Sequence, residues 1–437
     1  MNGKKSWCKI FRTVFGIALL SGGGLSPRIQ ASTDALLDKL VQKGILTAEE
    51  AASLREESAG EHKSRLSLPE WIESVKFGGD FRLRYDSIQS DLPSYSDRNR
   101  FRYRLRFGVT FHLAHDLETG LRLASGSSLD PLSNNQTFRN NGTFKGIYVN
   151  QAYLKWSPLH TGGWKGYLLG GKMKNPVTMP ATILFDHDYM PEGFAEALSR
   201  DINDDHRVSL LATQFVLDDL RVSADDPYMF GAQVRWDGQW SERIKTSLGA
   251  GGFWITHPET LTPSNVPYVG RGNTRAPNGT LVYDYHIFAG DVALTYTFDS
   301  APLYRGPFPV MLLGSLIHNF GAPDDNLGYA VGLKIGRARQ GGQWELNYQW
   351  RHVEADYWWD QVVESDFGAV RPPPVPGRSV GYFSGSNLRG HCFKGTYSIF
   401  DQWSVSVVYA LSEEIKVPAG AGHHSTGRLF VETSVKY

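Results

Sequence analysis

Hydrophobic and polar residues alternate along residues 98–113. Arginine occupies every even position from Arg98 to Arg106, and the odd positions from Phe101 to Leu113 are apolar or aromatic. A period of two places one type of side chain on each face of a β-strand. Globular strands usually have ~5–6 residues, whereas a strand that crosses a membrane needs ~9–11. The length and the alternation therefore predict a transmembrane strand, with its odd face in lipid and its even face in water.

The same alternation recurs along the rest of the chain. Trp344, Leu346 and Tyr348, for example, alternate with Glu345 and Asn347. One such segment is weak evidence, but recurrence over most of the chain is typical of a transmembrane barrel. We expect about sixteen strands, at residues 75–86, 98–114, 117–126, 147–157, 165–174, 192–200, 206–217, 228–237, 241–255, 283–298, 308–319, 328–338, 343–357, 390–400, 402–413 and 426–437.

The connections between these segments tend to alternate between long and short. Long ones fall near residues 87–97, 127–146, 175–191, 256–282, 358–389 and 414–425. Outer-membrane barrels have long external loops and short periplasmic turns, and bacterial examples have an even number of strands. The fold class is therefore predicted to be all-β, a transmembrane antiparallel β-barrel of about sixteen strands formed by residues 70–437.

Two other segments precede the barrel. Residues 1–31 combine a basic start, a short apolar core and small residues near the end, which predicts a signal peptide. Residues 32–69 predict a short periplasmic helical segment and linker, with a capping box formed by Thr47 and Glu50. Of the two cysteines, Cys8 lies in the signal peptide, so Cys392 has no partner for an intrachain disulfide.

Composition narrows the function classes. Among the 437 residues, Lys+Arg and Asp+Glu both number 45, so no overall charge points to nucleic acid. No run of ~18 apolar residues predicts a spanning helix. The motifs of serine hydrolases, P-loop proteins and zinc proteases are absent from the sequence. We therefore predict no enzyme, with no catalytic residue, no metal site and no cofactor.

The arginines form the main candidate site. The predicted pore-lining residues are Arg82, Arg84, Arg100, Arg102, Arg104, Arg106 and Arg122. Neighbouring guanidinium groups repel one another and need carboxylates, water or anions close by. Two interpretations remain open. The arginines create a field that favours anions or orients solutes, or they form a solvated wall that is neutralised by Asp80, Asp86 and Glu118.

Several stretches resemble a family of bacterial outer-membrane proteins, the putative porins with a short helical N-terminal segment. They are GLRLASGSSLDPLSNNQTF at 120–138, VNQAYLKW at 149–156, GGKMKNP at 170–176, FDHDYMPEG at 185–193, GYAVGLKIG at 328–336, WELNYQWRHVEAD at 344–356 and ESDFG at 364–368. The resemblance implies an outer-membrane diffusion channel, but it names no solute and no functional residues.

In many porins the third external loop folds into the lumen and narrows it. Here the corresponding segment is 175–191, and the constriction candidates are Asp186, Asp188 and Glu192. Acids facing an arginine wall would make a transverse field. The alternative is that these are ordinary turn residues. A calcium site would lack the spacing of an EF-hand.

Taken together, these observations predict a water-filled channel for passive diffusion of small hydrophilic solutes and ions in the outer membrane of a Gram-negative-type bacterium. Its expected partners are outer-membrane lipid, the solutes themselves and further copies of the chain in a homotrimer, and not nucleic acid. A mild preference for anions is one option. The alternatives are a solute-specific channel and an outer-membrane barrel enzyme, either a protease or a lipase, with its residues at the barrel rim.

Overall fold

A computed structural model describes residues 39–43, 46–53, 68–221, 223–268, 270–371, 381–417 and 419–437. The chain divides into two compact units, Met1–Glu70 and Trp71–Tyr437. The predicted signal peptide lies outside the described residues. Among the described residues, no helix is long and apolar enough to span a membrane.

The first unit contains two short helical segments, residues 39–42 and 48–53. The Glu50 N–H donates to the Thr47 hydroxyl at 3.1 Å, and the Thr47 N–H donates to the Glu50 carboxylate at 2.8 Å. This reciprocal pair is the predicted capping box, which satisfies N–H groups that have no partner within the helix.

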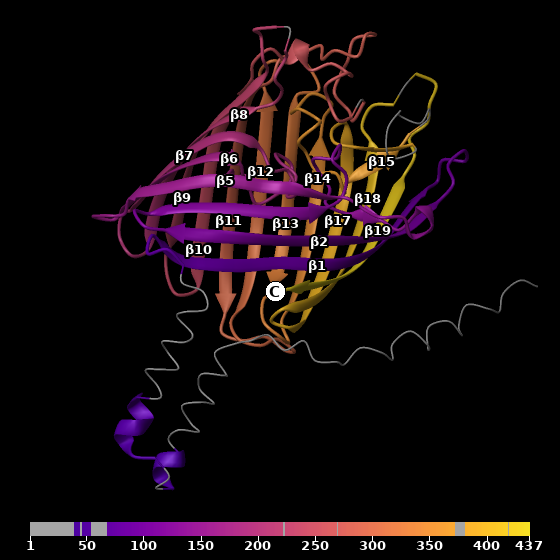
Figure 1. The fold of residues 1–437 in the computed structure, drawn as a ribbon. Coiled ribbons are helices and arrows are strands. Elements are labelled where there is room, and N and C mark those ends of the chain that lie inside the picture. The colour runs from indigo at the N-terminus through magenta and orange to yellow at the C-terminus, as the bar shows by residue number, and fades with distance from the viewer. Residues whose placement is uncertain are drawn as a thin grey trace, which may run out of the picture. The chain divides into compact units, whose positions relative to one another are not determined.

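The second unit is a closed barrel of sixteen long antiparallel strands (Figure 1). They are β1 (Ile72–Ser90), β2 (Arg98–Leu113), β3 (Leu117–Ser125), β5 (Ile147–Leu159), β6 (Trp164–Lys172), β7 (Glu192–Asp201), β8 (His206–Val216), β9 (Tyr228–Gln239), β10 (Ile244–Ile255), β11 (His286–Phe298), β12 (Phe308–Asn319), β13 (Leu327–Gly336), β14 (Trp344–Val353), β17 (Leu388–Phe400), β18 (Trp403–Glu414) and β19 (Thr426–Lys436).

Each barrel strand pairs with its neighbours in the chain, and β1 closes the barrel by pairing with β19 as well as with β2. The predicted fold class is therefore confirmed. The main differences in strand length are at β1, which spans Ile72–Ser90 although the prediction gave residues 75–86, and at β14, which ends at Val353 although the prediction extended it to residue 357. Three short strands lie in loops. β4 (Gln136–Thr137) pairs with β2, and β15 (Gly368–Val370) pairs with β16 (Tyr382–Ser384).

The alternating pattern separates the two faces of the wall as predicted. On β2, Phe101 and Phe107 face outward, with 60% and 46% of their surface exposed, whereas Arg102 on the inner face is 8% exposed. An apolar outer surface suits lipid, because hydrocarbon has no partner for polar groups.

Four loops at one end of the barrel are named here by number. L2 comprises residues 126–146, L3 residues 173–191, L5 residues 256–285 and L7 residues 354–387. The opposite end has short turns, such as residues 114–116 and 160–163. This difference between the two ends is the arrangement of external loops and periplasmic turns that the sequence predicts.

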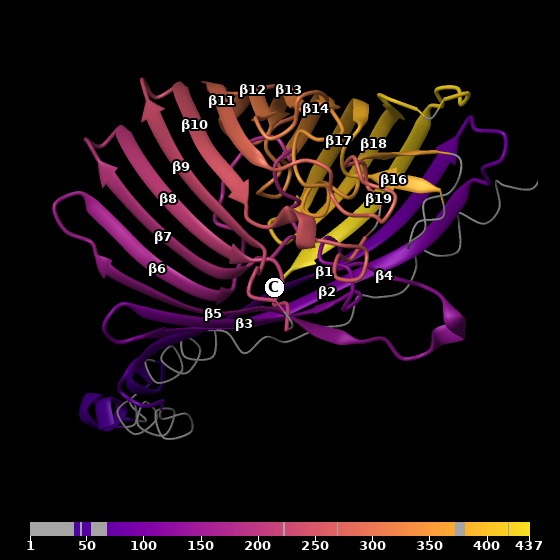
Figure 2. The ribbon, with the colours of Figure 1, turned by 90° about the horizontal axis from the view of Figure 1, so that it is seen from above.

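The hydrophobic core of the second unit lies inside the barrel, where L3, L5 and L7 pack together (Figure 2). Trp358 of L7 is fully buried, with its ring edge-on to Phe185 of L3 at 6.3 Å and to Tyr285 of L5 at 6.1 Å. Burying large aromatic side chains stabilises the inward position of all three loops.

Buried polar contacts fasten L5 to L7. The Asn273 side-chain amide donates to the carbonyl oxygens of Ala355 and Trp358, both at 2.8 Å. The Thr274 hydroxyl donates to Asp356 at 2.6 Å. Because buried polar groups lose water, such satisfied pairs fix one loop conformation against the other.

Candidate functional site: the lumen beneath the inward-folded loops

The inner wall of β1 and β2 carries most of the predicted arginines. The register sets Arg82 opposite Arg104, and Arg84 opposite Arg102. Like charges directly opposite one another on a sheet are destabilising, so this arrangement requires carboxylates nearby.

Two carboxylates of β1 neutralise part of this wall. Asp80 binds Arg104 at 2.7 Å and Arg106 at 2.5 Å. Asp86 is completely buried and binds Arg100 at 2.5 Å.

Asp86 also contacts two other arginines, Arg428 of β19 at 3.2 Å and Arg102 at 3.8 Å. Glu118, which the sequence offered as a third acid for the wall, instead accepts a hydrogen bond from the Tyr153 hydroxyl at 2.8 Å and lies 3.6 Å from His112. Asp80 and Asp86 therefore fill the expected neutralising role, and Glu118 does not.

Two more acids come from other elements. Glu432 of β19 binds Arg84 at 2.5 Å and Arg82 at 3.3 Å. Asp366 of L7 binds Arg84 at 3.0 Å and Arg428 at 3.5 Å. Burial alone would raise the pKa of Asp366, but Arg84 and Arg428 hold that pKa well below its usual range, so this carboxylate stays ionised.

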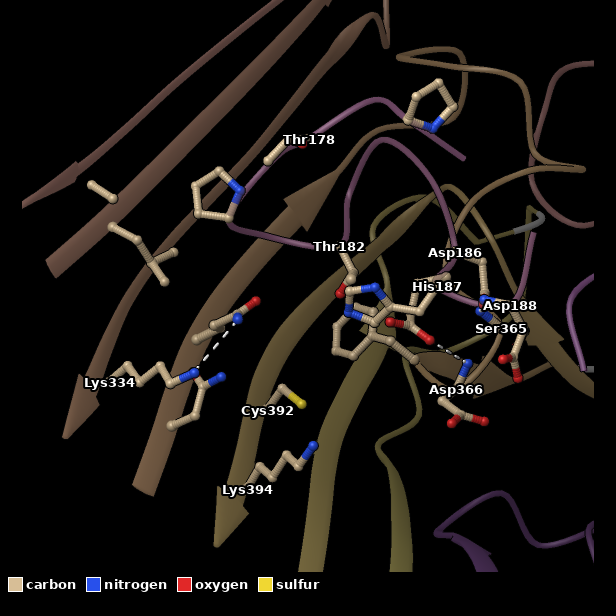
Figure 3. Close-up of a pocket in the computed structure, with 18 of the residues that line it drawn as sticks. Thr178, Thr182, Asp186, His187, Asp188, Lys334, Ser365, Asp366, Cys392 and Lys394 are labelled. Carbon is tan, nitrogen blue, oxygen red and sulfur yellow. Dashed lines mark hydrogen bonds between the residues drawn. The ribbon is translucent and has the colours of Figure 1, made fainter. Parts of the chain in front are cut away.

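L3 crosses the lumen and contacts three separated parts of the wall. Its Thr182 hydroxyl accepts a hydrogen bond from Arg351 of β14 at 2.8 Å, and its Thr178 carbonyl accepts one from Gln233 of β9 at 2.7 Å. Asp188 lies 3.5 Å from Arg106 of β2. Figure 3 shows Thr182, Asp186 and Asp188 on this loop, close to Asp366 of L7.

Asp186 joins L3 to L7. Its carboxylate accepts hydrogen bonds from the N–H groups of Ser365 at 2.9 Å and Asp188 at 2.8 Å, and its own N–H donates to the Val362 carbonyl at 2.8 Å. Burial, together with the neighbouring acids Glu364 and Asp188, raises the pKa of Asp186 well above its usual value.

Glu192, the third acid proposed for the constriction, is not brought together with Asp186 and Asp188. It begins β7, on the same face as the outward-pointing Phe194, and its side chain is 64% exposed. It pairs with Lys172 of β6 at 2.7 Å. The structure therefore places Glu192 on the outer side of the wall.

L2 covers part of the arginine wall. Arg82 donates to the Asn135 side-chain oxygen at 2.8 Å, and Arg102 donates to the Asn135 carbonyl at 3.1 Å. Arg100 and Arg102 point into the barrel, but neither lines a described cavity. Both lie against Asp86, and Arg102 also lies against L2.

A cavity of ≈ 1000 Å³ lies beside L3 and L7. Charges of both signs line it: Arg82, Arg84, Arg104, Arg207, Arg235, Lys334, Arg351 and Lys394 with Asp186, Asp188, Asp237, Glu345, Glu364, Asp366 and Glu432. The cavity is therefore close to electrically balanced.

A second cavity, of ≈ 660 Å³, lies against the short-turn part of the wall. Its charged lining consists of Lys76, Arg82, Arg104, Arg106, Arg122, Lys394 and Lys436, with Asp80, Glu345 and Glu432. Cations clearly outnumber acids here. Several residues, including Arg82 and Lys394, line both cavities, so the two spaces adjoin.

Sequence analysis missed several charged residues of the barrel interior, among them Lys334 of β13, Lys394 of β17, Arg428 of β19 and Asp366 of L7. Arg428 has the same parity on β19 as Glu432 and Lys436, so the alternation contained the signal for it. Asp366 carried no such signal, because it belongs to a loop whose position depends on distant contacts.

A closed sixteen-stranded barrel with an apolar outer surface, a charged lumen and loops folded into it is an outer-membrane diffusion channel, a porin by class. The model of a family described as "Putative porin" matches residues 89–254. This match confirms the resemblance for the four stretches between residues 120 and 193. Both the match and the fold are consistent with a diffusion channel.

Solved structures agree on the fold. Pseudomonas putida OprB aligns with a TM-score of 0.51 and 12% identity, over 83% of this chain and 94% of that one. A porin of Rh. blastica aligns with a TM-score of 0.43 and 10% identity, over 83% and 100%. Salmonella typhi OmpF gives 0.46 and 8%, over 83% and 97%. The assignment of fold rests on the first of these. Comparison with curated proteins gives no match.

Proposed function

We propose that this channel passes small hydrophilic solutes by diffusion, with a modest preference for anions. The observation that carries the proposal is the cationic lining of the cavity of ≈ 660 Å³. Seven cationic side chains line this cavity, but only three acidic ones do. A fixed excess of positive charge on a rigid wall attracts anions into the lumen.

The preference is expected to be modest because the acids of the lumen oppose it. We assign pore-lining roles to Arg82, Arg84, Arg104, Arg106 and Arg122, and constriction roles to Asp186 and Asp188. Asp188 is already close to Arg104 and Arg106, so its charge is largely neutralised. Salt screens wall charges over ~8 Å at physiological strength, so the preference grows as salt is diluted.

The test is the reversal potential of the purified protein in planar bilayers under a KCl gradient. The wild type should favour chloride, by roughly twofold at 0.1 M salt, where the Debye length is ~10 Å. Changing Arg106, Arg122 and Lys394 together to Gln should abolish that preference. Arg102 is left intact because it holds L2.

A matched control removes three cations that line none of the described cavities, by changing Arg139, Lys145 and Lys165 together to Gln. This control should keep the wild-type reversal potential. A cation-selective wild type, or a lumenal triple variant with unchanged selectivity, would refute the proposed anion preference.

We also infer that the channel works without catalysis or a bound metal. Within the described ranges, no group of three or more His, Cys, Asp or Glu side chains could hold a metal ion. The N-terminal helical segment, residues 32–69, is proposed to be a periplasmic spacer that precedes the barrel.

We infer further that the barrel assembles into a homotrimer through the outer face of β6–β9. Glu196 of β7 shares the parity of the outward Phe194 and accepts a hydrogen bond from Gln214 of β8 at 3.0 Å. Small residues, Ala212 and Ala232, lie beside it in an apolar hollow of ≈ 800 Å³. An acid facing lipid is costly, so cover by another subunit supports the proposal.

A further inference from the structure

Four adjacent strands set hydroxyl and guanidinium groups side by side on the inner wall. The register pairs Ser404 of β18 with Ser434 of β19, Ser434 with Arg82 of β1, and Arg82 with Arg104 of β2. Neighbouring strands lie ~4.8 Å apart, so this row spans ~14 Å, the scale of a small organic solute. We call these four residues the hydroxyl–arginine row.

All four members of the hydroxyl–arginine row line the cavity of ≈ 660 Å³. The side chains of Ser404 and Ser434 have no hydrogen-bond partner in the described part of the chain. Ser406, the next inward residue of β18, differs because its hydroxyl donates to Glu432 at 3.2 Å. The two serines of the row are therefore free to bind a solute in the cavity.

The two strands that border the hydroxyl–arginine row each carry a cation that lines the same cavity. The register sets both cations four residues away from the row, with Arg122 opposite Gly108 and Lys394 opposite Val408. Arg122 of β3 is held by neutral acceptors, Asn150 at 2.7 Å and the sulfur of Met190 at 3.4 Å. Lys394 of β17 extends into the lumen in Figure 3. Neither cation forms an ion pair with a carboxylate among the described residues. Each therefore offers a single positive charge that the protein itself does not neutralise.

The combination of hydroxyl groups and cations in this cavity favours one class of solute. Arginine and lysine bind oxyanions through charge-assisted hydrogen bonds, and serine hydroxyls both donate to and accept from alcohol groups. A simple anion would use only the cations, and a neutral polyol only the hydroxyls. The two arginines of the row already form ion pairs within the protein, Arg104 with Asp80 and Arg82 with Glu432. The remaining cations of the cavity, Lys76, Arg122, Lys394 and Lys436, form no ion pair within the described residues. Each offers one positive charge, which suits a carboxylate better than a phosphate dianion.

We propose that the lumen binds hydroxylated carboxylates, the chemical class of sugar acids, along the hydroxyl–arginine row. The carboxylate lies at Arg122 or Lys394, and the hydroxyl groups of the solute lie at Ser404 and Ser434. This inference rests on the proposed diffusion-channel function and specifies its solute. A weak binding site in a channel raises the flux of its solute, provided that release stays fast.

The test uses the purified full chain in planar bilayers carrying a chloride current. Gluconate has both a carboxylate and hydroxyls, propionate has only the carboxylate, and sorbitol has only hydroxyls. Gluconate should reduce the current at a concentration roughly tenfold lower than propionate, because two extra hydrogen bonds of ~1 kcal/mol each more than account for a factor of ten. Equal block by gluconate and propionate would overturn the proposal.

Variants locate the site. Changing Ser404 and Ser434 together to Ala should raise the half-blocking concentration of gluconate roughly fivefold, while chloride conductance and reversal potential stay unchanged. Arg122→Gln should also weaken the block. The matched control is Ser209→Ala, because Ser209 lines the larger cavity and not the smaller one. Gluconate should block this variant at the same concentration as the wild type. Unchanged gluconate block in the double serine variant would overturn the assignment.

The outcome separates this inference from the proposed function. A folded barrel with no chloride current would refute the channel itself. A normal chloride current without preferential block by gluconate would refute only the sugar-acid site.

Discussion

At the scale of single residues, shared carboxylates allow the arginine wall to exist. Asp86 is completely buried and contacts Arg100, Arg102 and Arg428. A buried guanidinium without a partner is strongly destabilising, so each acid supports several cations at once. The same neutralisation is the reason why we expect only a modest field in the lumen despite the many arginines.

Asp186 should make the docking of L3 on L7 depend on pH. Its pKa is raised in the docked loop by burial and by Glu364 and Asp188. The docked loop therefore keeps a proton that an undocked loop releases at the ordinary carboxyl pKa near ~3.9. Docking is strongest below that value and weakens as pH rises toward the raised pKa.

Cys392, which lines the cavity beneath these loops, reports on this change. The rate at which a thiol reagent modifies Cys392 should increase with pH faster in the wild type than in Asp186→Asn. Dividing one rate by the other removes the intrinsic pH dependence of the thiol. A ratio that stays constant from pH 4 to pH 8 would show that Asp186 does not control docking.

At the scale of an element, β2 shows how the two faces of one strand suit two different environments, lipid and the aqueous lumen. Its odd residues contact lipid and its even residues contact the lumen, so equal changes of charge should have unequal effects on the two faces. Inner-face positions tolerate polar groups because water, other side chains and loops satisfy them.

Phe107→Arg should impair folding into the membrane. Phe107 is 46% exposed on the outer face, and a cation there costs ~2–4 kcal/mol near the bilayer midplane. Arg104→Gln is the matched control on the inner face, because Asp80 keeps Arg106 as a partner. The measurement is the fraction of folded, heat-modifiable protein on gels. Equal folding of the two variants would contradict the assignment of faces.

At the scale of the whole molecule, the inward-folded loops and the outer face have separate roles. L3, L5 and L7 form a core within the barrel and leave two adjoining charged cavities. The outer face is apolar except at places such as Glu196 and Gln214. The lumen would then determine which solutes pass, and the outer face how copies associate.

Glu196→Trp should convert the proposed trimer into a folded monomer, because a bulky ring fills the hollow beside Ala212 and Ala232. Leu312→Trp, on the outer face of β12, is the control and should remain trimeric, since Leu312 lies outside that hollow. Light scattering of the detergent-solubilised protein gives the mass. A monomeric wild type, or a trimeric Glu196→Trp variant, would contradict the proposed interface.

Most of the barrel could be predicted from the sequence alone because its cause is local. A period of two determines which face of each strand meets lipid, and loop residues mark where strands end. The alternation of Arg100 to Arg106 with apolar residues therefore identified a membrane strand and its inner face. The Thr47–Glu50 capping box was predictable for the same reason, since its two residues lie three positions apart.

Only the tertiary structure decided which of the inner-face side chains meet water. Arg102 and Arg106 have the same parity on β2, yet one is covered by L2 and the other lines a cavity. Trp358 and Asp366 belong to a loop whose path depends on contacts with L3, L5 and β1. Such contacts join residues far apart in the chain and leave no periodic signal, so the outline of the lumen emerged only when the loops were in place.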